Sequence, residues 1–301
     1  MNGLIRLAVI FYLFSIVIYP RAVRAEDTTV FVSILPQKYF VQQISKGRVS
    51  VEVMVQPGAS PATYEPKPSQ MKQLSSSAVY FAIGVPFEAA WLGKIAGVNP
   101  NMSVIHTDAE IEKIPMSSHS HEEAVDHTSH HQDHRQHEVL DPHTWLSPRL
   151  VKQQVRVIFE RLSQLVPHYA AEFQINFDQL ITSIDKLDTE LRMLFRDNEG
   201  MQFMVFHPSW GYFAREYGLE QIAIEIEGKA PKPAQLQKLI EYAKEHDIRI
   251  IFAQPQFSLK NAKLVAREIN GEVVRADPLA EDWLQNIKEV ADKFKRASRK
   301  P

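Results

Sequence analysis

Three side chains of types that bind metals lie beside prolines in this sequence. His143 follows Asp141-Pro142, and both His207 and Asp277 come directly before a proline. The 301-residue chain has no cysteine, so a transition metal would have to be bound by imidazole nitrogens and carboxylate oxygens. Two imidazoles and one carboxylate suit Zn²⁺, and Mn²⁺ and Fe²⁺ are alternatives. Copper is not excluded, because its intrinsic affinity for such ligands exceeds that of zinc.

Each of these residues also has a simpler interpretation when it is taken alone. An isolated histidine at such a junction can cap the next helix, and an Asp-Pro pair commonly forms a turn or a helix cap. The combination of two histidines and one aspartate at strand–loop or loop–helix junctions nevertheless favours a common metal site. A structural zinc site normally has four protein ligands, so three ligands indicate a capture site or a catalytic site.

Predicted strands place two of the three residues at equivalent positions. His207 follows a predicted strand at 202–206, and Asp277 follows one at 272–275. In open α/β sheets, ligands bind in the crevice outside the carboxyl ends of the strands. We therefore expect both side chains at the carboxyl edge of a sheet.

The order of the predicted elements indicates the α/β class. The second half alternates strands and helices, at 202–206, 208–217, 221–226, 233–245, 248–253, 259–269, 272–275 and 281–295. The first half reads as strand, helix, strand, helix and strand, followed by a helix through Trp91, at 29–34, 37–45, 51–56, 69–74 and 79–84. Such alternation implies parallel sheets covered by helices. Without the N-terminal segment described below, about 276 residues remain, more than one core usually fills, so two lobes are expected.

Two helices are predicted between these halves. Ser147-Pro148, shortly after His143, is typical of a cap and first helical residue, and predicts a helix running towards Leu165. A longer helix of about 30 residues, roughly 45 Å, should follow and end near residues 198–200. It carries an apolar stripe with alternating spacings of four and three, at Phe173, Phe177, Leu180, Ile184, Leu187, Leu191 and Leu194. We expect it to lie across both lobes, and a self-associating coiled coil is the alternative.

The first 25 residues are typical of a secretory signal peptide. Arg6 provides a positive charge, residues 7–19 are apolar, and Val23-Arg24-Ala25 resembles a cleavage site. The apolar stretch is shorter than the roughly 20 residues of a membrane span, and an uncleaved N-terminal anchor is the alternative. Removal lowers the net charge from −2 to −5, because the segment has three arginines and no acidic residue. With no basic surface for nucleic acid and no cysteine for a lipid anchor, we expect a free periplasmic protein.

Residues 117–138 interrupt the pattern with a polar segment that we predict to be disordered. Seven histidines lie in it, namely His119, His121, His127, His130, His131, His134 and His137. Histidines four residues apart, such as His127 and His131, would share one face if the segment became helical. These residues are candidates for auxiliary zinc binding, and a solvated linker is the alternative. Three further histidines are expected at the surface near element ends: His106, His168 and His246.

A set of motifs, in this order, resembles the periplasmic metal-binding proteins of ABC transporters. They occupy residues 57–66, 141–148, 207–213 with 217–219, 227–229 and 276–279. The resemblance is to the zinc-uptake (ZnuA-like) branch of the cluster A-I solute-binding family, and it covers nearly the whole chain after the first 25 residues. It implies two lobes, each a mainly parallel sheet covered by helices, joined by one long rigid helix, with metal between them. It also implies capture of Zn²⁺, or of Mn²⁺, and delivery to an ABC transporter permease in the inner membrane by a protein that usually acts as a monomer.

The resemblance assigns the metal to His143, His207 and Asp277. It also shows a departure, because the family pattern Pro-His-Thr-Tyr-Glu-Pro has Ala62 in place of its histidine here. The loss of one imidazole should weaken or reshape the site unless water, Glu65 or a histidine of 117–138 replaces it. A turn-capping role for Glu65 is the alternative to ligation.

These observations divide the chain into four parts. They are a signal peptide (1–25), an N-terminal metal-binding lobe that contains the insert (26–165), a connecting helix (166–199) and a C-terminal metal-binding lobe (200–301). We expect a solute-binding protein that is not an enzyme.

Two other functions remain open at this stage. Two histidines and one carboxylate also occur in non-haem iron oxygenases and zinc hydrolases. A hydrolase would need a general base near the metal, for which Glu65 is the one candidate. The second alternative is a periplasmic zinc buffer or chaperone that uses the histidine-rich segment without a transporter.

Overall fold

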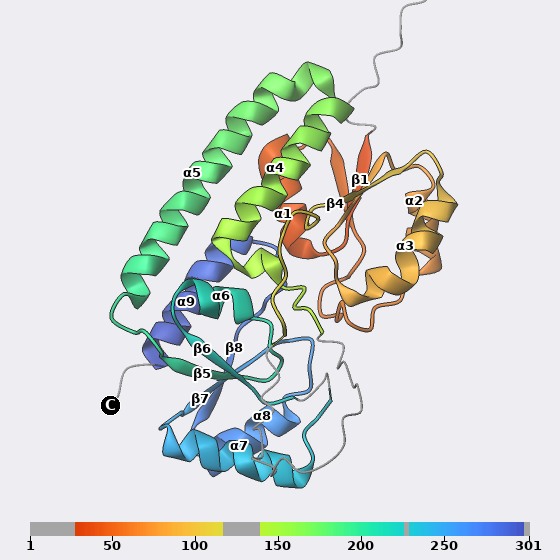
Figure 1. The fold of residues 1–301 in the computed structure, drawn as a ribbon. Helices are drawn as coiled ribbons and strands as arrows, with labels where there is room; N and C mark the ends of the chain where they lie inside the picture. The colour runs from red at the N-terminus through yellow and green to blue at the C-terminus, as the bar shows by residue number, and fades with distance from the viewer. Residues whose placement is uncertain (1–27, 117–138, 226–228, 298–301) are drawn as a thin grey trace, which may run out of the picture.

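The chain forms two lobes, each built on a four-stranded parallel sheet, in a computed structural model that describes residues 28–116, 139–225 and 229–297 (Figure 1). The N-terminal sheet has the order β2-β1-β3-β4, with β1 (Thr29–Val32), β2 (Ser50–Val53), β3 (Val79–Ala82) and β4 (Ser103–His106). The C-terminal sheet repeats it as β6-β5-β7-β8, with β5 (Gln202–Val205), β6 (Glu220–Ala223), β7 (Ile250–Ala253) and β8 (Glu272–Arg275). The prediction of two parallel-sheet lobes is therefore confirmed.

Strand β4 is the one element of the N-terminal sheet that the sequence pattern did not indicate. It is an edge strand that pairs only with β3, and none of its four residues is fully buried. With two apolar residues between Ser103 and His106, it has too little periodicity to be recognised from the sequence.

Prolines begin most helices of the N-terminal lobe. Helices α1 (Leu35–Ser45), α2 (Pro68–Leu74), α3 (Pro86–Val98) and α4 (Pro148–Leu165) each have a proline in the first two positions, where no backbone N–H is needed. Ser147 caps α4 as predicted, because its hydroxyl accepts the backbone N–H of Leu150 at 3.2 Å.

The C-terminal helices follow their strands as predicted, but α6, α8 and α9 start one to three residues later than expected. They are α6 (Gly211–Glu216), α7 (Pro233–Glu245), α8 (Lys260–Glu268) and α9 (Trp283–Ala297). Helix α6 begins three residues after the predicted position 208. Residues 207–210 form a turn instead, in which the Ser209 N–H donates to the His207 carbonyl at 2.8 Å and the Trp210 N–H donates to the Gln221 side chain at 2.7 Å.

The long helix is α5 (Ala170–Phe195), preceded by a short 3-10 turn at Pro167–Tyr169. Its 26 residues span about 39 Å, slightly less than the length we expected. Figure 1 shows α5 beside α4, reaching from the N-terminal lobe to the level of α9, and it contacts α1, α4 and α9. All but the last residue of the predicted apolar stripe are buried there. The stripe is thus explained by packing within one chain rather than by self-association.

An apolar core continues from one lobe to the other. Phe40 of α1 meets Trp283 of α9 edge to face, with ring centroids 5.3 Å apart. The Trp283 indole N–H donates to the Trp145 carbonyl at 2.6 Å, and the Trp145 indole N–H donates to the Pro278 carbonyl at 2.7 Å. These contacts join the segment after His143 to the segment after Asp277.

In the described ranges, no helix has the length and apolar character needed to cross a membrane. The predicted signal peptide lies outside the described residues.

Candidate metal centre

The structure brings two of the predicted ligands, His143 and His207, into contact between the lobes. Their ring centroids are 5.1 Å apart, with 69° between the ring planes. His143 directly precedes a 3-10 turn (Thr144–Leu146) that leads into α4, and His207 follows β5 of the other lobe. Residues that are 64 positions apart in the sequence are therefore adjacent at the carboxyl edge of the C-terminal sheet.

His143 is held by a buried carboxylate. Oδ1 of Asp141 lies 2.7 Å from the His143 Nδ1 and also accepts the His143 backbone N–H at 2.9 Å. Burial lowers the pKa of His143, although the charge of Asp141 and its hydrogen bond act in the opposite direction. The imidazole is therefore neutral at neutral pH. With the Nδ1 proton donated to Asp141, the Nε2 lone pair is available to a metal.

His207 is held in the same manner by Glu225. Its Nδ1 lies 2.5 Å from Oε1 of Glu225, which is also buried. The backbone of His207 is fixed by Gln254, whose side chain accepts its N–H at 3.2 Å and donates to its carbonyl at 2.6 Å. The ring stacks on Phe257 with centroids 4.8 Å apart. A carboxylate on Nδ1 is the usual arrangement behind a zinc-binding histidine, because it fixes both the tautomer and the ring orientation.

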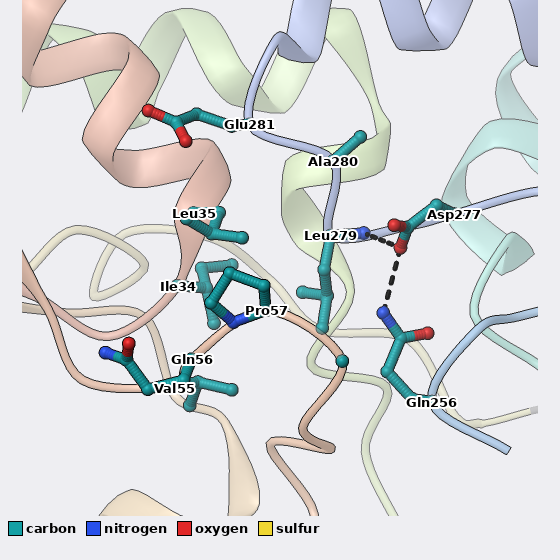
Figure 2. A pocket seen from close by; sticks show the side chains of 11 residues that line it. Ile34, Leu35, Val55, Gln56, Pro57, Gln256, Asp277, Leu279, Ala280 and Glu281 are labelled. Carbon is teal, nitrogen blue, oxygen red and sulfur yellow. Dashed lines mark hydrogen bonds between the residues drawn. The ribbon is translucent and has the colours of Figure 1, made fainter.

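Asp277 follows β8 at the same edge but makes other contacts. Its Oδ1 accepts the backbone N–H of Leu279 and the side-chain amide of Gln256, each at 2.9 Å. The first bond is the Asx turn that was the simpler interpretation of Asp-Pro. Figure 2 shows Asp277 facing Gln256 at the border of a cavity of about 260 Å³. Residues of both lobes line this cavity, including Val55 and Pro57 from the N-terminal lobe.

Trp145 connects His143 with the segment that carries Asp277. Its ring lies against His143, with centroids 5.1 Å apart, and its indole N–H binds the carbonyl of Pro278, the neighbour of Asp277. Within the part of the chain that the structure describes, no three histidine, aspartate or glutamate side chains form a ready-made group that could hold a metal. The two histidines thus already lie together, whereas the carboxylate of Asp277 is hydrogen-bonded to Gln256 instead of joining them.

The other candidates lie apart from this pair. Ala62 and Glu65 are exposed, in a loop tied down by the Phe87 N–H, which donates to the Pro61 carbonyl at 3.1 Å. The seven histidines of 117–138 and the motif residues Glu227 and Gly228 lie outside the described residues. The prediction for the remaining three histidines is confirmed, since all are exposed at or near element ends: His106, His168 and His246.

The sequence interpretation missed the roles of Asp141 and Glu225. Asp141 gave a weak signal, because it lies two residues before His143 in the same motif. Glu225 gave none until the pairing of β5 with β6 was known. The register pairs Val205 with Ala223, so that His207 and Glu225 both lie two residues beyond their strands.

Comparison with known proteins identifies the family of this chain. The family profile described as "ZnuA: Zinc-uptake complex component A periplasmic" matches residues 30–297. A high-affinity zinc uptake system protein ZnuA of Yersinia pestis is 26% identical over 265 residues, covering 84% of this chain and 83% of that protein. A crystal structure of ZnuA is 38% identical, with a TM-score of 0.81 over 90% of this chain and 99% of that chain.

A second solved structure, of a ZnuA deletion mutant with zinc bound, is also 38% identical, with a TM-score of 0.81 over 91% of this chain and 99% of that chain. The matches extend over both lobes and the connecting helix. The chain therefore belongs to the family of the periplasmic component A of zinc-uptake complexes, and Zn²⁺ is the ligand that this membership assigns to it.

Proposed function

We propose that the protein captures Zn²⁺ between its two lobes and delivers it to the permease of an ABC transporter. The observation that carries this proposal is the pair His143 and His207, one from each side of the lobe boundary. Each ring has a buried carboxylate on Nδ1, which leaves both Nε2 atoms for a common ion. A site made only of nitrogen and oxygen ligands suits reversible capture, because no thiolate holds the ion.

Asp277 is the third proposed ligand. To reach the ion, its carboxylate would exchange the hydrogen bond from Gln256 for the metal, while the Leu279 N–H still holds the backbone turn. Because Asp277 and Gln256 both line the interlobe cavity, this exchange would change the lining of the cavity when zinc binds. The family pattern has a fourth ligand, a histidine, where this chain has Ala62. Water, Glu65 or a histidine of 117–138 would provide the fourth ligand here.

The remaining parts of the proposal concern location and partners. The family description and the predicted signal peptide support a periplasmic protein, and this sequence has no cysteine that could carry a lipid. The expected partner is a permease in the inner membrane, and the protein is expected to act as a monomer. Mn²⁺ is the alternative cargo, because it also accepts imidazole and carboxylate ligands.

A chelator-competition titration with Zn²⁺ tests the proposal. It compares the chain lacking residues 1–25 with a form that also lacks 117–138, each with and without His207→Ala. One tight site that survives loss of 117–138 and disappears in His207→Ala is the expected result. If tight binding is lost with 117–138 and is unaffected by His207→Ala, the interlobe site is wrong and the zinc-buffer alternative takes its place.

A further inference from the structure

Tyr212, a residue of the C-terminal lobe, binds the backbone of the N-terminal lobe directly behind His143. Its side chain is buried near the start of α6. The hydroxyl donates to the Asp141 carbonyl at 2.9 Å and accepts the Ile114 N–H at 3.1 Å. The Asp141 N–H in turn donates to the Ile114 carbonyl at 2.8 Å. One hydroxyl therefore joins two segments that are 27 residues apart in the sequence.

The Tyr212 ring fixes where this hydroxyl lies. It packs in a small apolar cluster with Ile111, Ile114 and Leu150, separate from the main core of the lobes. Removal of the hydroxyl alone would leave this packing in place. Tyr212→Phe therefore changes the hydrogen bonds to Asp141 and Ile114 without creating a cavity.

The Asp141 carboxylate lies against Gly211, which leaves room for it because glycine has no Cβ atom. A Cβ atom at Gly211 would lie only 2.8 Å from Asp141 Oδ2, a distance that would force the carboxylate to move. The other oxygen, Oδ1, makes both bonds to His143. A shift of this carboxylate would therefore be transmitted to the ring.

We propose that Tyr212 and Gly211 are positioning residues for the metal site, which hold the Asp141 main chain and carboxylate and thereby the orientation and tautomer of His143. The tautomer of His143, a ligand from the N-terminal lobe, thus depends on contacts with α6 of the C-terminal lobe. The effect on zinc affinity rests on the function proposed above. The effect on the His143 tautomer does not, and it can be measured without metal.

Nitrogen NMR of the metal-free full chain tests the tautomer. In the wild type we expect His143 and His207 to carry their protons on Nδ1. In Tyr212→Phe, His143 should populate a second tautomer, while His207, held by Glu225, should be unchanged.

Tyr217→Phe is the matched control. It removes another buried hydroxyl, bonded to Asp188 at 3.0 Å, just after the same helix, and should leave both histidines as in the wild type. A His143 spectrum of Tyr212→Phe identical to that of the wild type would overturn the proposal.

Gly211→Ala separates positioning from general stability. Zinc affinity, measured at a temperature where the variant is fully folded, should fall by about tenfold or more, as is usual for changes behind a ligating histidine. Gly93→Ala in α3, where an added Cβ would meet nothing within 4 Å, should leave affinity unchanged.

The possible failures are distinguishable. Equal zinc affinity of Gly211→Ala and the wild type would overturn the positioning role of Gly211. If the wild type itself binds no zinc, the proposed function fails, and the NMR comparison still decides the positioning role.

Discussion

His207 and Glu225 each lie two residues beyond paired parallel strands, and their side chains meet with Nδ1 of the histidine 2.5 Å from Oε1 of the glutamate. The sheet register thus sets the ring orientation of a candidate ligand. Because the ligands are placed by strand pairing and by buried carboxylates, substitutions behind the histidines should change metal binding without direct contact with the metal.

Glu225→Gln should weaken zinc binding by about 10- to 100-fold, because an amide holds the His207 tautomer less strongly than a carboxylate does. Chelator-competition titration measures this change. Glu220→Gln, on the strand that precedes Glu225, is the control, since the Glu220 carboxylate accepts a hydrogen bond from the partly buried side chain of Gln202 and is not bonded to His207. Equal affinities of Glu225→Gln and the wild type would show that this carboxylate does not support the ligand.

Ala62→His restores the imidazole that the family pattern has at this position. If the loop brings position 62 to the interlobe ion, we expect tighter zinc binding, because one more protein ligand replaces solvent or a weaker donor. The same titration in a His207→Ala background is the control. A gain that persists in that background would mean that the new histidine binds zinc elsewhere.

The pH dependence of metal-free stability should reveal the buried state of His143. Burial lowers its pKa in the folded protein, so just below about pH 6.5 the unfolded chain binds a proton that the native state does not. The free energy of unfolding contributed by this residue therefore decreases as the pH falls. Denaturant unfolding of wild type and His143→Ala in the presence of chelator, between pH 7.5 and 5.5, measures it. A free energy of unfolding of the wild type that rises relative to that of His143→Ala as the pH falls would contradict the expected sign.

Zinc binding should also weaken at low pH, because protonated imidazoles cannot bind metal. The lowered pKa of His143 means that this residue stays competent to a lower pH than an exposed histidine would. Titrations at several pH values in the form lacking 117–138 isolate the interlobe site. An affinity that does not change between pH 7.5 and 5 would exclude histidine ligation there.

Trp283→Phe should destabilise the protein by about 2–4 kcal/mol, because it removes a buried hydrogen bond to the Trp145 carbonyl and leaves a cavity beside Phe40. Denaturant unfolding measures the loss. Trp91→Phe is the control, since Trp91 is only partly buried on α3, and it should cost much less. Equal losses in the two variants would show that the interlobe contact does not contribute specifically.

Local patterns determined most of the elements. The apolar stripe of α5, the proline-started helices and the alternation of the second half each depend on neighbours within one or two turns. Helix α7 and strand β8 have the predicted bounds. Strand β4 was missed because an edge strand buries little, and α6 starts late because the Gln221 side chain, which accepts the Trp210 N–H, stabilises a turn at its expected beginning.

By itself, the sequence determined the candidate ligand types, their place after strands and before a helix, and the missing imidazole at Ala62. Only the tertiary structure decided that His143 and His207 touch, that Asp141 and Glu225 hold them, and that Asp277 is bonded to Gln256. The physical reason is that residue type and local periodicity are properties of short segments. Ring contacts and hydrogen bonds to the ligands instead depend on strand register and on the docking of two lobes, which no short segment encodes.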